Sequence, residues 1–137
     1  MRFGKDSKAA AISSVPLFSR CSRGELGQIA QIVDEVDLPA GKTLTKEGAP
    51  GHEFFVLLEG TADVRSETRL LPPLGPGDFF GEIALVANVP RMATVTTTSP
   101  VHALVLTGGA FRELLRKSPA IQSKVLEAVA SRLAATL

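Results

Sequence analysis

The sequence predicts a mainly β domain with flanking helices: an antiparallel β-roll, jelly-roll-like, preceded by one helix and followed by two. Short β-prone runs punctuated by glycine and proline fill about residues 36–106, as in barrels, sandwiches and jelly rolls. No alternation of strands with helices interrupts this block, so a parallel doubly wound sheet is not expected. On both sides of it, apolar residues recur with the period of an α-helix. The 137 residues suit one domain of ordinary size.

The helix before the β-roll is predicted over residues 23–34. Ser22 and Glu25 have the spacing of a capping box. Behind them, one apolar stripe repeats at helical positions and consists of Leu26, Ile29, Ala30 and Val33. We assign residues 1–14 to an N-terminal tail and residues 15–137 to the domain, with residues 15–18 forming a short apolar segment that packs onto it.

The β-roll is expected to contain seven or more short strands. They are placed at residues 36–38, 43–46, 54–58, 62–65, 69–71, 93–98 and 101–106. Residues 61–71 are interpreted as a hairpin that turns at Ser66-Glu67-Thr68.

Two helices are predicted after the β-roll, over about residues 108–137. The first has Thr107 as its cap and an apolar face of Phe111, Leu114 and Leu115. The second starts at Ser118-Pro119, with Ser118 as N-cap and proline in the first helical position. Its apolar residues follow at steps of four: Ile121, Val125, Val129 and Leu133.

Composition excludes several classes of function. A net charge of +1 gives no general attraction to nucleic acid, so direct nucleic-acid binding is not expected. The single Cys21 forms no intrachain disulfide, and His52 and His102 lie too far apart in sequence to suggest a metal centre with it. No apolar run has the length of a signal peptide or a membrane span. We therefore expect a cytoplasmic location, without membrane insertion.

The segment that indicates chemistry is residues 79–96. Gly81 precedes Glu82 and a short apolar run that includes the small Ala84, a pattern suited to a turn that opens a helix and presents free backbone N–H groups to an anion. Arg91 follows Pro90, which fixes the local backbone. An arginine beside such N–H groups suits a phosphate.

Glu82 does not fit a site for an anion alone. A carboxylate would repel phosphate unless it accepted hydrogen bonds from an adjacent group, and a sugar hydroxyl is the natural donor. The pair therefore suggests a phosphate joined to a ribose. The alternative is a structural salt bridge between Glu82 and Arg91 at a corner of the barrel.

Residues 81–85 followed by 90–95 resemble the phosphate-binding cassette of the cyclic-nucleotide-binding domain family. This family includes regulatory subunits of cyclic-AMP-dependent protein kinase, the bacterial catabolite activator protein and nucleotide-gated channels. Further segments resemble the family's strand–glycine motif, its approach to the cassette and its early turns: residues 55–62, 74–81, 38–41 and 46–48. The resemblance covers roughly residues 15–135.

The resemblance implies a role for each matching position. Glu82 would accept from the ribose 2′-hydroxyl, Arg91 would pair with the cyclic phosphate, and backbone N–H groups around Ala84, Leu85 and Ala93 would complete the phosphate cradle. Gly81 would avoid crowding the ribose, and Ala84 would let the helix start approach the phosphate. The expected ligand-binding residues are Gly81, Glu82, Ile83, Ala84, Leu85, Arg91, Met92 and Ala93.

Met92 bears on the choice of nucleotide. Family members that prefer cyclic GMP often carry a threonine after the arginine, so Met92 favours cyclic AMP, with cyclic GMP remaining open. Thr94 could contact the ligand or be an ordinary strand residue. An apolar residue such as Val129 or Leu133 is expected to cap the base.

The resemblance implies a regulatory sensor that needs no cofactor or metal and is not an enzyme. The helices after the β-roll would serve as hinge and lid and relay the bound state to an unknown effector protein or domain. No cluster of histidine, cysteine and acid residues supports a phosphodiesterase or a cupin-type metal enzyme. The alternative is a structural or dimerisation domain without a ligand, cut from a larger regulator or channel; a homodimer through the last helix is left open by analogy.

Overall fold

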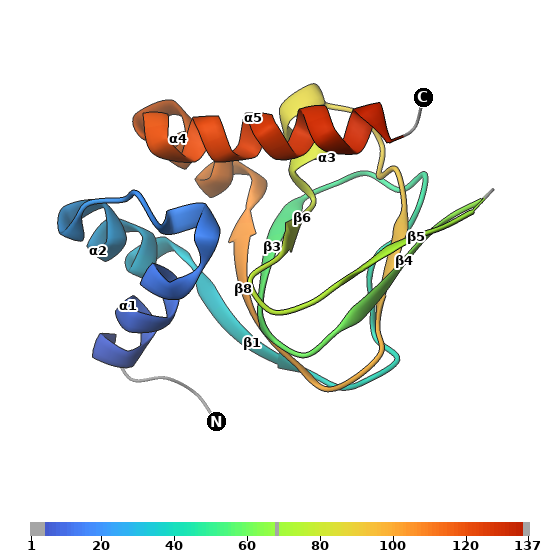
Figure 1. Ribbon diagram of the computed structural model, residues 1–137, viewed down its shortest axis with the longest axis horizontal. Helices are drawn as coiled ribbons and strands as arrows, with labels where there is room; N and C mark the ends of the chain where they lie inside the picture. Colours follow the sequence, from blue (N-terminus) through green and yellow to red (C-terminus); the bar gives the residue numbers. More distant parts are fainter. Residues whose placement is uncertain (1–4, 68, 136–137) are drawn as a thin grey trace.

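The computed structural model describes residues 5–67 and 69–135. Two four-stranded antiparallel sheets form the β-roll, and helices from both ends of the chain gather at one side and across the top of it in the view of Figure 1. One sheet has the strand order β1-β8-β3-β6, and the other has the order β2-β7-β4-β5. The predicted fold class, β with flanking α, is confirmed.

The strands of the β-roll are short and joined by tight turns. Their bounds are β1 Asp34–Leu38, β2 Thr43–Thr45, β3 Glu53–Glu59, β4 Ala62–Ser66, β5 Arg69–Leu74, β6 Phe79–Phe80, β7 Thr94–Thr97 and β8 Val101–Thr107. Strand β8 pairs with both β1 and β3, with Leu104 opposite both Glu35 and Val56. All of the predicted strands are present, with shifts of a few residues at their ends.

The helices lie at the two ends of the chain, apart from one that stands between β6 and β7 in the sequence. They are α1 Lys5–Ser14, the 3₁₀ turn η1 Pro16–Phe18, α2 Arg23–Ile32, α3 Glu82–Ala87, α4 Gly108–Lys117 and α5 Pro119–Ala134. The predicted caps are formed: Ser22 and Glu25 make a full capping box, the Ala110 N–H donates to Thr107, and the Ile121 N–H donates to Ser118. No helix in residues 5–67 and 69–135 is both long and apolar enough to cross a bilayer.

Three parts of the fold differ from the sequence prediction. The segment assigned to a tail forms α1, because Ile12 is fully buried beside α2 and anchors it. Strand β5 runs through Pro72-Pro73, which an edge strand tolerates because its outer N–H groups need no partner. Strand β6 was not predicted, since two residues are too few for a pattern. Of the predicted hairpin turn, Thr68 lies outside the described residues.

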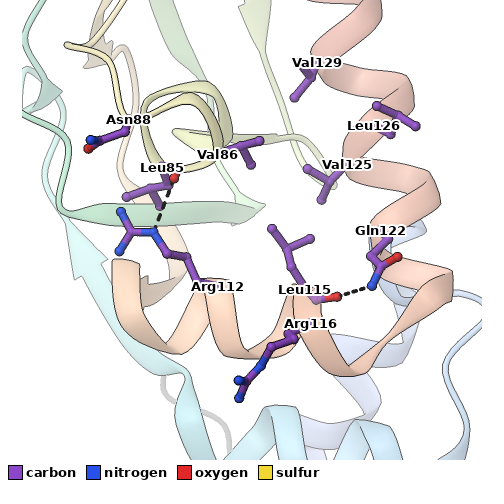
Figure 2. A pocket seen from close by; sticks show the side chains of 10 residues that line it. All are labelled: Leu85, Val86, Asn88, Arg112, Leu115, Arg116, Gln122, Val125, Leu126 and Val129. Carbon is purple, nitrogen blue, oxygen red and sulfur yellow. Dashed lines mark hydrogen bonds between the residues drawn. The ribbon is translucent and has the colours of Figure 1, made fainter.

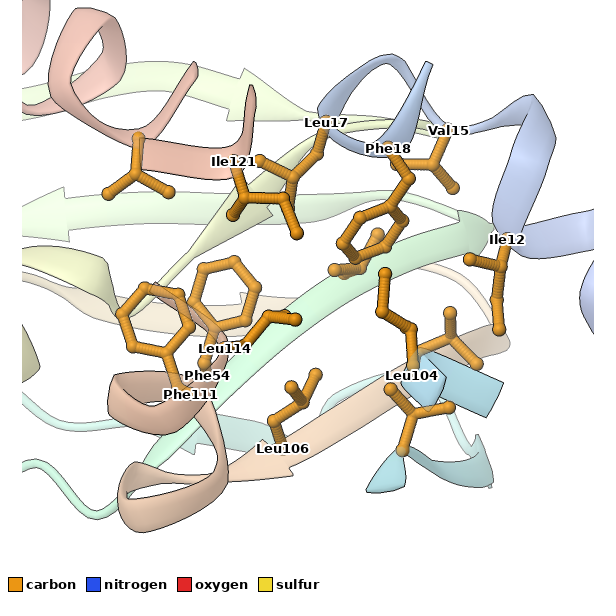
Figure 3. Packing of buried hydrophobic residues seen from close by; sticks show 14 of the residues in the cluster. Ile12, Val15, Leu17, Phe18, Phe54, Leu104, Leu106, Phe111, Leu114 and Ile121 are labelled. Atoms are coloured by element: carbon orange, nitrogen blue, oxygen red, sulfur yellow. The ribbon is translucent and has the colours of Figure 1, made fainter. Parts of the chain in front are cut away.

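A buried apolar cluster joins the helices to the β-roll (Figure 3). Phe54 of β3 stacks on Phe111 of α4 with ring centroids 4.2 Å apart, and both rings are fully buried. Leu17 and Phe18 of η1 and Ile121 of α5 belong to the same cluster. The first turns of the last helix are therefore held by the core, not by surface contacts.

A second buried feature is an ionic cluster on the sheet that contains β1. The ring of His102 lies between two carboxylates, with Nδ1 2.5 Å from Asp37 and Nε2 2.8 Å from Glu35. Burial by itself lowers the pKa of His102, but the hydrogen bonds to Asp37 and Glu35 outweigh it, and the pKa is raised above its ordinary value. Because both ring nitrogens face acceptors, the protonated form fits this site best.

We predict that His102 contributes stability that declines as the pH rises. Its folded-state pKa is raised above the unfolded value, so the contribution is fully present below about pH 6.5 and is lost as the pH passes the folded-state pKa. His102→Ala should cost about 2 kcal/mol near pH 6, because it removes a buried ring that hydrogen-bonds to both Glu35 and Asp37. Urea unfolding at several pH values measures both effects. A wild-type-minus-variant difference that grows with pH would contradict this assignment.

Candidate functional site

The site is built around a left-handed glycine at the start of α3. Gly81 has φ +97° and is the N-cap of that helix, with no side chain capping the helix N-terminus. A Cβ atom at Gly81 would lie 2.8 Å from both Arg91 Nη1 and the Glu53 carbonyl oxygen. Only glycine fits here. From the sequence, Gly81 was expected to leave room for a ribose. In the structure, the close approach of Arg91 and the Glu53 carbonyl already requires glycine at this position.

Glu82, directly after Gly81, carries a carboxylate that is almost completely removed from solvent, with the residue 1% exposed. Arg132 of α5 donates from Nη1 to Glu82 Oε1 and from Nη2 to the Phe79 carbonyl oxygen. The Arg132 guanidinium carbon also lies 5.3 Å from the centroid of the Phe79 ring, within reach of a cation–π contact. One arginine of the last helix thus holds the acid of the cassette.

Arg91 is buried and is oriented by backbone carbonyls. Its Nη1 donates to the Gly81 carbonyl at 3.2 Å, and its Nη2 donates to the Glu53 carbonyl at 2.7 Å. The backbone N–H of Arg91 donates to the Ala49 carbonyl oxygen at 2.8 Å, so the loop between β2 and β3 fixes the Arg91 backbone as well. Burial lowers the pKa of Arg91, while the carboxylates of Glu53 and Glu82 raise it. An arginine remains cationic under these conditions.

Glu82 and Arg91 do not form the salt bridge that the sequence left open as an alternative. Each side chain has different partners, Arg132 for Glu82 and two carbonyls for Arg91. Carbonyls orient Arg91, and the carboxylates of Glu53 and Glu82 act on it only through space. A charged guanidinium therefore lies next to a buried acid.

The other predicted positions divide into buried and exposed ones. Ala84 and Leu85 are buried, Ile83 and Ala93 are half-buried, and Met92 is 40% exposed. Ala84 is approached by the backbone of Gly51, where an added Cβ would lie 2.7 Å from the Ala84 Cβ. Gly51 was not predicted, since only its place against Ala84 and Arg91 identifies it. Thr94 has a structural contact: its hydroxyl accepts from the Glu47 N–H at 3.0 Å.

The last helix lies across the site and is fastened at its end. Val129 is half-buried in a groove beside α3 and Leu133 is 42% exposed. Arg69 of β5 donates to the Ala135 carbonyl at 2.7 Å, just past the end of α5, and a cation there also favours the helix dipole. Arg132 was missed from sequence, because a polar residue on an amphipathic helix gives no signal of its partner. No group of three or more His, Cys, Asp or Glu within the described ranges is arranged to hold a metal ion.

Comparison with known proteins agrees with this geometry. The family model for the cyclic nucleotide-binding domain matches residues 35–118, which include both sheets, α3 and α4. The chain belongs to this family of cyclic-nucleotide-binding regulatory domains, which are not themselves catalytic.

Similar proteins include channels and kinase subunits. The chain is 36% identical over 110 residues to a cyclic nucleotide-gated potassium channel of Mesorhizobium japonicum, a match covering 80% of this chain and 30% of the channel. It is 37% identical over 108 residues to a cAMP-dependent protein kinase regulatory subunit of Aspergillus fumigatus, covering 77% of this chain and 26% of the subunit. The chain thus spans less than a third of these relatives.

A solved structure, PKAR CBD2 with Sp-2Cl-cAMPS bound, superimposes on nearly the whole chain. The TM-score is 0.81 at 25% identity, with 98% of this chain and 94% of the other covered. The helices at both ends therefore belong to the shared fold.

We predict that Gly81→Ala destabilises the chain by about 2 kcal/mol, because alanine at φ +97° is strained and its Cβ meets Arg91 and a backbone carbonyl. Gly109→Ala in α4, where an added Cβ has no neighbour within 4 Å, is the matched control and should be neutral or slightly stabilising. Chemical unfolding followed by circular dichroism measures both. Equal effects of the two substitutions would remove the argument for Gly81.

Proposed function

We propose that this chain binds cyclic AMP in preference to cyclic GMP, and that α4 and α5 relay binding to an effector. One observation carries the proposal: a buried arginine oriented by two backbone carbonyls lies next to a buried acid, and the cation on that acid comes from the last helix.

Arg91 supplies the phosphate contact. A guanidinium has five N–H donors, and carbonyls take two of them here. The remaining donors and the uncapped first turn of α3, with the N–H groups of Ala84 and Leu85, suit the oxygens of a cyclic phosphate. The N–H of Ala93 belongs to the same expected cradle.

Glu82 supplies the ribose contact. Arg132 occupies Oε1, which leaves Oε2 for the 2′-hydroxyl. A buried carboxylate near a phosphate repels it unless a cation compensates. Arg132 provides this compensation, so the acid can accept from the sugar without lowering the affinity for the phosphate.

The same contact suits a relay. A nucleotide that engages Glu82 stabilises the arrangement in which α5 lies against α3, and it shifts the lid only by its difference in affinity between the two arrangements. A factor of about one hundred corresponds to about 2.7 kcal/mol, within reach of an arginine–phosphate contact and a buried base.

Selectivity rests on Met92. Its side chain carries no hydroxyl to bind the guanine amino group, which favours cyclic AMP.

Isothermal titration calorimetry tests the ligand. We expect cyclic AMP to bind with micromolar or tighter affinity, cyclic GMP more weakly, and 5′-AMP weakest, since 5′-AMP lacks the cyclic diester. Arg91→Ala should weaken cyclic AMP more than about tenfold through loss of charge-assisted hydrogen bonds.

Arg65→Ala is the matched control, because Arg65 is an exposed arginine of β4 and its removal changes the net charge equally. It should leave the affinity unchanged. If folded protein gave no binding heat with either cyclic nucleotide, the ligand assignment would fail.

Arg132→Ala tests the relay. We expect it to weaken cyclic AMP about tenfold, because buried Glu82 then faces the phosphate without its cation. Hydrogen exchange adds the readout specific to a relay: cyclic AMP should slow exchange of α5 amides in the wild type and much less in the variant.

Arg116→Ala is the control here, since Arg116 is an exposed arginine of α4 paired with Glu113. It should leave both the affinity and the exchange of α5 unchanged. Normal protection of α5 by cyclic AMP in Arg132→Ala would show that the signal takes another route.

A further inference from the structure

An open groove of about 810 Å³ lies between α3, α4 and α5 (Figure 2). Its apolar lining comes from all three helices: Leu85 and Val86 of α3, Leu115 of α4, and Val125, Leu126 and Val129 of α5. The groove shares Leu85 with the cassette, whereas Glu82 and Arg91 do not line it. It therefore adjoins the candidate nucleotide site, with which it shares Leu85 and Val129, the latter a residue expected to cap the base, but it does not include the Glu82 and Arg91 side chains.

The rim of this groove carries apolar side chains that the chain leaves in solvent. Leu126 is 69% exposed and Val86 is 51% exposed, on opposite walls. Adjacent exposed apolar groups around a concave apolar surface are typical of a binding site. A partner covering the groove would bury both.

The charge of the lining is positive. Its polar members are two arginines and two amides, and no carboxylate lines it. Arg116 points away from α3 in Figure 2 and pairs with Glu113. Arg112 lies at the groove with its Nε 3.3 Å from the Leu85 carbonyl, and no described carboxylate pairs with it. Arg112 is therefore the cation with which an acidic side chain of a partner would pair.

The shape favours a helix as the partner. The walls are helices whose backbone groups are bonded internally, so an extended peptide finds no strand edge to pair with. The groove is open to solvent, so a single acyl chain would remain partly in water, whereas sites for small ligands enclose most of their ligand. An amphipathic helix can fill the groove with one face and keep its other face in solvent.

We propose that this groove docks an amphipathic α-helix of a partner protein, with apolar side chains at i, i+3, i+4 and i+7 and an acidic residue that pairs with Arg112. Leu126 and Val86 pack on either side of that helix. The groove exists as described because α5 lies against α3.

Docking and nucleotide binding are coupled in this arrangement, a part of the inference that rests on the proposed function. Arg132 on Glu82 holds α5 where it forms the groove wall. Cyclic AMP and the helix then favour the same arrangement, so each raises the affinity for the other by the same factor.

The test uses two capped helical peptides of about 18 residues. Both carry leucines at the spacing above; one has glutamates and the other lysines at the flanking positions. Fluorescence anisotropy measures affinity, and amide chemical shifts locate the site. We expect the glutamate peptide to bind at the residues of α3, α4 and α5 that line the groove. The affinity of the lysine peptide should be lower by a factor of about ten or more.

Two variants and a control sharpen the result. Leu126→Glu should weaken the glutamate peptide about tenfold or more, and Arg112→Glu should reverse the preference between the peptides. Leu70→Glu is the control for adding a charge at an exposed leucine, since Leu70 is 65% exposed in β5, outside the groove. It should change nothing.

The proposal is overturned if the glutamate peptide fails to bind at millimolar concentration, shifts residues elsewhere, or is unaffected by Leu126→Glu. A dimer in sedimentation that Leu126→Glu dissociates would mean that a second copy fills the groove. Saturable binding of dodecanoate in place of the peptide would indicate an amphiphile. Both results overturn it.

Calorimetry with cyclic AMP on the same samples separates the two proposals. Peptide binding without cyclic AMP binding keeps the docking site and removes the coupling. Cyclic AMP binding without peptide binding removes the docking site and leaves the nucleotide function intact.

Discussion

The site depends on the neutralisation of one buried carboxylate. Glu82 is 1% exposed, and an unpaired charge at that depth would be costly. The cation comes from Arg132, fifty residues further along the chain, so the position of α5 and the ionic state of the cassette are linked. Phe79 supports the same arginine with its carbonyl and its ring. Gly81 aims Glu82 inward, because its left-handed conformation turns the chain from β6 directly into α3.

Arg91 is held by a different kind of contact from Glu82. Carbonyls orient its guanidinium without cancelling its charge. One of them belongs to Glu53, at the end of the loop whose Gly51 lies against Ala84 and Arg91. The cassette thus combines an acid that is paired with Arg132 and a guanidinium that carbonyls orient, on which the carboxylates of Glu53 and Glu82 act only through space. A ligand that joins a hydroxyl donor to an anion suits both.

Local chemistry determines how much of this the sequence could predict. The capping box of Ser22 and Glu25 and the caps Thr107 and Ser118 depend on residues three apart, so they were predicted correctly. The candidate cassette could be proposed from sequence because its two segments lie close together in the chain. Arg132, Gly51 and β6 were missed because each is defined by a partner distant in sequence. Helix α1 was missed because its buried anchor, Ile12, stands in an alanine-rich run without a clear apolar stripe.

The size of α3 bears on how the proposed nucleotide site would be coupled to the groove beside it. The helix has six residues, fewer than two turns, and its residues contact both of the last two helices. Glu82 begins it and faces Arg132, whereas Leu85 is buried against the core cluster that contains Phe111 and gives its carbonyl to Arg112. In the proposed relay, a displacement at Glu82 would reach α4 through Leu85 and α5 through Arg132. Both helices line the groove beside α3, so the proposed relay would also change the shape of the groove.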